Sequence, residues 1–133
     1  MSAASDYLEN KLLDHVLTST SYSSPNATLY LALFTSDGGL ENNTEGSQTE
    51  ISGGSYVRKT IAFSAASGGS ASNNATVTFD AATANWGTIS HVAVMDASSS
   101  GNVLFWGAVT TSKTIESGDT FQVSSGNLTI SLA

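Results

Sequence analysis

The sequence predicts a mainly β fold, a β-sandwich of about seven or eight short strands with one N-terminal α-helix, and jelly-roll connections are an open alternative. Short alternating apolar stretches recur along the chain, and turn-forming Ser, Gly and Asn residues lie between them. Strong helix formers are few beyond the first segment. Because the 133 residues contain no linker-like stretch, we expect a single domain over residues 1–133.

The N-terminal stretch predicts the one helix, over residues 5–18. Ser5 suits the N-cap position, and acidic residues follow it at the positive end of the helix dipole. Leu8, Leu12 and Val16 recur every four residues and form an apolar stripe. Such a short helix is marginal alone in water, so the stripe must pack on the domain or on a neighbouring copy. These three residues are therefore the candidate assembly interface.

Residues 28–132 are expected to form the sandwich. The segment 29–34, LYLALF, is apolar on both alternating faces, as is typical of a central strand buried on both sides. Residues 35–54 are polar and acidic, which predicts a mobile loop that could offer oxygen ligands to calcium, and residues 64–74 predict a further loop. We expect the other strands at 56–63, 75–79, 89–95, 102–109, 120–123 and 128–132, with 89–95 and 102–109 paired as a hairpin.

The charge balance argues against several classes of partner. Eleven acidic residues face four basic ones, for a net charge of −7, and the basic residues form no cluster. Nucleic acids and anionic membranes are therefore not expected partners. No apolar run is long enough to span a bilayer and no secretory leader is evident, so we expect synthesis in the cytoplasm.

Few side chains in the sequence could carry chemistry. The chain has no cysteine and only two histidines, which are far apart, so we expect no transition metal and no other cofactor. His91 lies near Asp96 and several serines, but no nucleophile-elbow pattern accompanies it. The glycine pairs lack the flanking pattern of a phosphate-binding loop. We therefore expect no enzymatic activity.

The two tryptophans keep a second class of function open. Trp86 is a candidate surface aromatic, able to stack on a sugar in a lectin-like module. Trp106 lies within the apolar stretch LFWGAV, where a core or interface position is the simpler interpretation. The alternative function is thus carbohydrate binding, for which loss of sugar binding on Trp86→Ala would be the test.

Several stretches, in order over nearly the whole chain, resemble a family of small virion proteins of tailed bacteriophages. They are SDYLENKLLDHV, LYLALFTS, EISGGSYVRK, TANWGTISHVAVMDA, LFWGAVTTSKTIESGDT and NLTISLA. Members of that family are often labelled tail-fibre or minor structural proteins, and the resemblance carries no catalytic residue.

The resemblance implies a non-enzymatic structural protein of the virion. Two roles stay open: a decoration or cement protein on the capsid surface, and a component of the tail fibre or baseplate. The expected partners are copies of the chain itself, in a trimer, and other virion proteins, and a glycan on the host surface remains a further candidate. The N-terminal helix, with Leu8, Leu12 and Val16, is the expected docking element.

Overall fold

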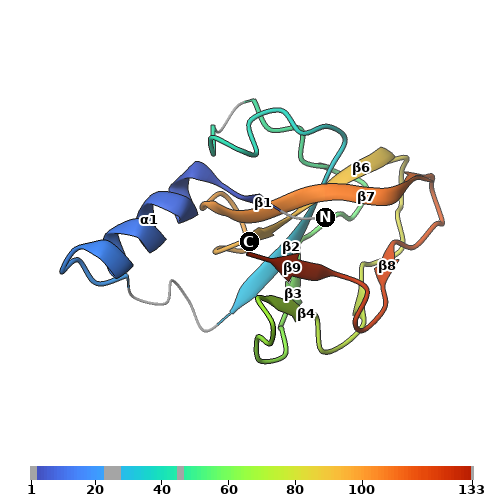
Figure 1. Cartoon of the computed structure of the whole chain (residues 1–133). Coiled ribbons are helices and arrows are strands. Elements are labelled where there is room, and N and C mark those ends of the chain that lie inside the picture. The colour runs from blue at the N-terminus through green and yellow to red at the C-terminus, as the bar shows by residue number, and fades with distance from the viewer. Residues whose placement is uncertain (1–2, 23–27, 45–46, 133) are drawn as a thin grey trace.

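The computed structural model describes residues 3–22, 28–44 and 47–132, and within them the fold is mainly β with one N-terminal helix, as predicted (Figure 1). The elements are β1 (Ala3–Ala4), α1 (Asp6–Leu17), β2 (Leu29–Phe34), β3 (Lys59–Ile61), β4 (Ser70–Ser72), β5 (Val77–Thr78), β6 (Gly87–Met95), β7 (Val103–Ile115), β8 (Gln122–Val123) and β9 (Thr129–Ser131).

The largest sheet has five antiparallel strands in the order β1-β7-β6-β2-β3. β6 and β7 form the hairpin predicted from residues 89–95 and 102–109. The pairing shifts register where Ile89 lies opposite Lys113 and His91 lies opposite Ala108. Between these two pairs only Ser90 stands opposite residues 109–112 of β7, which form an irregular bulge.

Both faces of the central strand β2 are buried, as its continuous apolar sequence predicts. Leu31 and Leu33 belong to the main core, and Ala32 and Phe34 to a second cluster on the opposite face. Opposite the main-core face lie two separate two-stranded ladders, β4–β9 and β5–β8. The sandwich thus has one extended sheet, and short ladders replace a second continuous sheet.

An aromatic group fills the main core between these layers. The rings of Tyr56 and Phe79 stack with centroids 6.0 Å apart, and Trp86 meets Tyr56 edge-on at 5.5 Å. Phe121 packs edge-on against Phe79 at 5.8 Å. Because these rings come from segments far apart in sequence, they tie the ladders to the sheet.

The second cluster is covered by the segment that the sequence predicts to be a mobile loop. Leu40, from this segment, is fully buried against Phe34 and the β6 residues of the cluster. Asn43 bonds across to the β6–β7 hairpin: its Oδ1 accepts from the Val103 backbone N–H at 2.9 Å. The described residues of this segment are therefore held against the sheet, because one buried leucine and one amide fix a largely polar stretch.

An ion pair between Arg58 and Glu50 joins the end of the 35–54 segment to the loop between β6 and β7. We call this pair, with the bonds of Arg58 to the loop, the charged clamp. Arg58 Nε and Nη2 each bond one oxygen of the Glu50 carboxylate, both at 2.7 Å, in a bidentate pair. Arg58 Nη1 donates to the carbonyls of Ala97 and Ser100, each at 2.8 Å. The Tyr56 hydroxyl donates to Glu50 at 2.8 Å and accepts from the Leu33 N–H. Three segments thus meet at one guanidinium group.

Candidate assembly surface

The base of α1 is fixed to the sheet through its N-cap. The Ser5 hydroxyl donates to the Val103 carbonyl and accepts from the Leu8 N–H at 3.3 Å, and the Ser5 N–H donates to Leu104 O at 2.9 Å. The Asp6 N–H donates to Glu41 O at 2.8 Å. Ser5 is fully buried and is the N-cap that the sequence predicts. These bonds set the direction in which the helix leaves the body.

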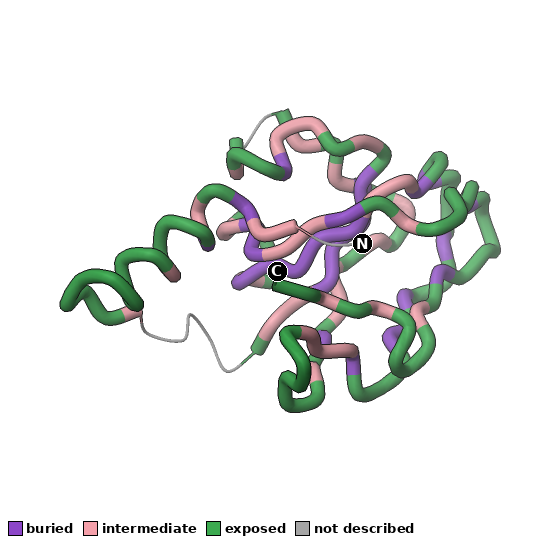
Figure 2. Tube along the Cα trace, in the orientation of Figure 1, coloured by how far each residue is buried: buried purple, intermediate pink, exposed green. Residues whose placement is uncertain are grey.

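The far half of α1 projects from the body (Figure 1), and its residues are exposed (Figure 2). Leu13, Val16 and Leu17 are 55%, 74% and 73% exposed. We call these three residues the helix tip. Their spacing of i, i+3 and i+4 places them side by side on one face of the helix.

The predicted stripe of Leu8, Leu12 and Val16 is therefore only partly an exposed surface. Leu8 is 5% exposed because it packs on the chain's own body, and Leu12 is half-buried. At about 100° per residue, the centre of the pair Leu13 and Leu17 lies roughly 140° around the helix axis from the centre of the pair Leu8 and Leu12. Val16 alone of the stripe belongs to the helix tip. In the sequence, the i, i+4 spacing of Leu13 and Leu17 is the pattern that indicates this second, exposed apolar face of the helix.

A groove runs along β7, between this strand and the C-terminal segment. Its volume is about 570 Å³, and β6 also contributes to it. Its apolar lining includes Phe105 and Val109 from the sheet, and Phe121, Val123 and Leu128 from the C-terminal segment. These residues belong to the main core or pack directly on it, so the groove is an opening between the sheet and the C-terminal segment that exposes part of the core. Residues 109–111 of the β7 bulge also line it.

Asn73 holds the outer wall of this groove. Its amide is 2% exposed, and its Nδ2 donates to Ala75 O at 2.9 Å and Ser124 O at 3.1 Å, while its Oδ1 accepts from the Leu128 N–H at 2.9 Å. One side chain therefore fixes the turn that leads from β8 to β9. Nothing in the local sequence distinguishes Asn73 from Asn74 beside it.

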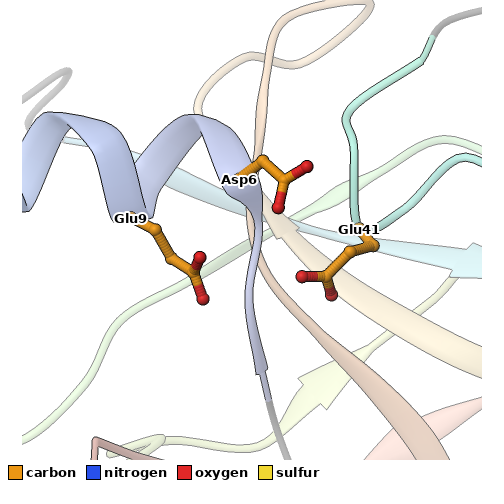
Figure 3. A group of neighbouring side chains, drawn as sticks. All are labelled: Asp6, Glu9 and Glu41. Atoms are coloured by element: carbon orange, nitrogen blue, oxygen red, sulfur yellow. The ribbon is translucent and has the colours of Figure 1, made fainter.

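Three carboxylates gather at the N-terminus of α1 (Figure 3). Asp6, Glu9 and Glu41 are exposed, and one carboxylate oxygen from each lies within 4.8 Å of those of the other two. Glu41 Oε2 also accepts from Trp106 Nε1 at 2.9 Å. The positive end of the helix dipole favours negative side chains at this place, so the cluster is explained without a bound cation.

The comparison with known families decides which class of protein this is. The model of the family described as podophage GP4 fiber I protein gp80 matches residues 3–131. The chain belongs to this family of bacteriophage tail-fibre proteins. No curated protein matches the chain.

As a tail-fibre protein, the chain is a non-enzymatic structural part of the virion that associates with other virion proteins. Of the two virion roles that the sequence left open, the family supports the fibre. The α1 helix of the described residues is neither long nor apolar enough to cross a membrane.

The two histidines and Asp96 have structural partners in the fibre protein. His91 Nδ1 lies 2.8 Å from the neighbouring Ser90 hydroxyl, and its ring packs against Trp106. The carboxylate of Asp96 accepts from the backbone and the side chain of Asn102, which closes the β6–β7 loop. His15 Nδ1 accepts from the Tyr22 N–H in the connector after α1.

The expectation of a surface aromatic at Trp86 is not met. Trp86 is 6% exposed, and its Nε1 donates to Gly54 O at 2.9 Å. Gly54 has a φ of +59°, and a Cβ there would lie 2.8 Å from Trp86 Nε1, so the backbone needs glycine for this approach. Trp86 is a core residue and offers no face for stacking on a sugar.

Proposed function

We propose that this tail-fibre protein assembles with copies of itself, in a trimer, through the exposed end of α1. The observation that carries the proposal is the helix tip, formed by Leu13, Val16 and Leu17 on a helix with a fixed base. We also propose that residues 1–133 act as one domain, since the two apolar clusters share strands β2 and β6.

Physical chemistry supports an assembly role for the helix tip. Large apolar side chains in water are unfavourable, by about 25 cal/mol for each Å² that a partner could bury. A twelve-residue helix in contact with its own body only through its first turns is also marginal by itself. A partner that covered the tip would remove both costs.

The fixed base of α1 supports the same role. Ser5 bonds the hairpin strand β7 directly, so the helix leaves the body in one direction. A docking element held in one orientation loses less conformational entropy on binding than a free tail would. The helix therefore suits repeated, identical contacts between subunits.

The test is the mass of the protein in solution. We expect the parent chain to form trimers by multi-angle light scattering, and the double variant Leu13→Ser/Leu17→Ser to be monomeric. Val57→Ser is the matched control, because Val57 is an apolar residue of similar exposure, 53%, that lies outside α1. Incorporation of the same variants into phage particles is measured by immunoblotting purified virions.

A monomeric parent chain, or a double variant that still forms trimers and enters virions normally, would refute the proposal. Deletion of residues 1–19 tests the same idea less sharply, because it also removes Ser5 and so the bond to β7.

A further inference from the structure

The helix tip and the β7 groove are two unpartnered apolar features of one chain. The tip presents Leu13, Val16 and Leu17 at i, i+3 and i+4, the spacing by which an amphipathic helix places its anchors in a groove. The groove, at about 570 Å³, has the volume of a site that accepts a few side chains.

We propose, on the basis of the self-assembly proposed above, that the helix tip of one copy packs into the β7 groove of the next copy. The occupant of the groove is thus α1 of a second copy of this chain. The contact is heterologous, since the two surfaces that meet are different.

The arrangement of the elements requires two copies for this contact. α1 projects away from the body (Figure 1), whereas the groove runs along β7 itself, from Phe105 and Trp106, which pair with β1, to the segment around β8. Ser5 fixes the base of the helix, so the tip cannot turn back into its own groove. Head-to-tail contacts of this kind close into a ring when the rotation allows it, and a three-membered ring gives the proposed trimer.

A ring also increases the area buried by each copy. One helix tip is a small contact for a stable complex, which commonly buries 1,200 Å² or more in total as an order of magnitude. In a ring every copy uses both its tip and its groove, so each subunit makes two such contacts. Two contacts per subunit, closed on themselves, hold the assembly more firmly than one.

The charges of the two surfaces are complementary. Lys113 is the one charged side chain among the residues that line the groove. Asp14 lies on an exposed position of α1 next to Leu13 and three residues before Leu17. In a chain of net charge −7, a groove whose only lining charge is positive suits an acidic helix of another copy.

Cross-linking tests the contact, because the chain has no cysteine of its own. Two variants, Leu17→Cys in the tip and Thr111→Cys in the groove, are co-expressed with different tags and treated with a short bismaleimide. Both positions are exposed, so neither variant should disturb folding. We expect a cross-linked dimer with one chain of each tag type, and none from either variant alone. Val57→Cys in place of Thr111→Cys is the control and should give no product.

The outcomes separate this inference from the proposed function. Trimers in which Leu17→Cys chains cross-link to each other would mean helix-to-helix contact, which overturns the groove as the binding site but keeps the assembly role of α1. Trimers in which Thr111→Cys chains cross-link to each other would mean pairing of β7 edges, with the same consequence. A monomeric parent chain would overturn both proposals.

Charge exchange provides a second measurement. Lys113→Glu should weaken association by up to about fivefold, the range of an exposed ion pair, and Asp14→Lys in the same chain should restore it. Sedimentation equilibrium measures the association constants. If the double variant associates no better than the worse single variant, the predicted apposition of these two residues is wrong.

Discussion

Removing the guanidinium of Arg58 is the sharpest test of how the body of the fibre protein is held together. Arg58 forms a bidentate pair with Glu50 and two bonds to the 96–101 loop, and its side chain is only 5% exposed. Arg58→Ala removes all four bonds at once and leaves the Glu50 carboxylate without its cation.

The magnitude follows from the bonds lost. Hydrogen bonds to charged groups contribute about 1.5–3 kcal/mol each, so the two bonds to Glu50 suggest a loss of about 3–6 kcal/mol. The Glu50 side chain is 24% exposed and can recover some hydration after the substitution. We therefore expect the free energy of unfolding to fall by about 3 kcal/mol, the lower end of the range for breaking a buried ion pair.

Lys59 is the matched control. It is the next residue, carries the same charge and pairs with Asp80 at 2.9 Å, but the two side chains are 29% and 58% exposed. Lys59→Ala should cost at most about 1 kcal/mol. Urea unfolding followed by circular dichroism measures both variants. Equal losses for Arg58→Ala and Lys59→Ala would refute the claim that burial and bidentate geometry give the clamp its strength.

Three further predictions concern single residues. Ser5→Ala should lower the free energy of unfolding by about 1–2 kcal/mol and lower the helical signal in circular dichroism, because α1 loses its cap and its bond to β7. Gly54→Ala should cost at least about 1 kcal/mol in urea unfolding and alter the fluorescence of Trp86, which the new Cβ would crowd. Burial, reinforced by the charge of Glu50, raises the pKa of Tyr56 well above 10.0. Since the unfolded chain loses this proton first, stability should fall as pH rises above about 10, and Tyr56→Phe should reduce that fall in urea titrations at about pH 9 and 11.

The parts of the fold that the sequence predicts well are those with strong apolar periodicity. β2 is apolar on both faces of its alternation, and both faces are buried. The β6–β7 hairpin follows from two alternating stretches separated by turn formers. The N-cap at Ser5 follows from residue type and from the acidic residues after it. In each case a local pattern agrees with the tertiary packing.

The parts that the sequence does not predict lack an apolar signal of their own. β7 continues through residues 110–114, which are exposed and polar, so alternation cannot mark this extension of the strand. β4 has the sequence SAS and forms only because β9 pairs with it, within a segment predicted to be a loop. The groove arises from segments far apart in the chain, and no local pattern encodes it.

The helix illustrates the same limit at the candidate site. Periodicity identifies α1 and shows that its Leu residues span about half of its circumference, but it cannot say which face the body will cover. The bonds of Ser5 to Val103 and Leu104 decide that question, because they fix the rotation of the helix on β7. Leu8 therefore faces inward, and Leu13 and Leu17 are left exposed.

The charge distribution bears on how an exposed tip and an open groove avoid random association. A net charge of −7 makes copies repel one another over about one Debye length, roughly 8–10 Å at physiological salt, whatever their orientation. The apolar tip attracts only on contact, so most encounters end before the tip can be buried. In the proposed arrangement the approach of Asp14 to Lys113 brings opposite charges together and offsets part of this repulsion. The acidity that opposes general aggregation would therefore also select the one docking geometry that assembly needs.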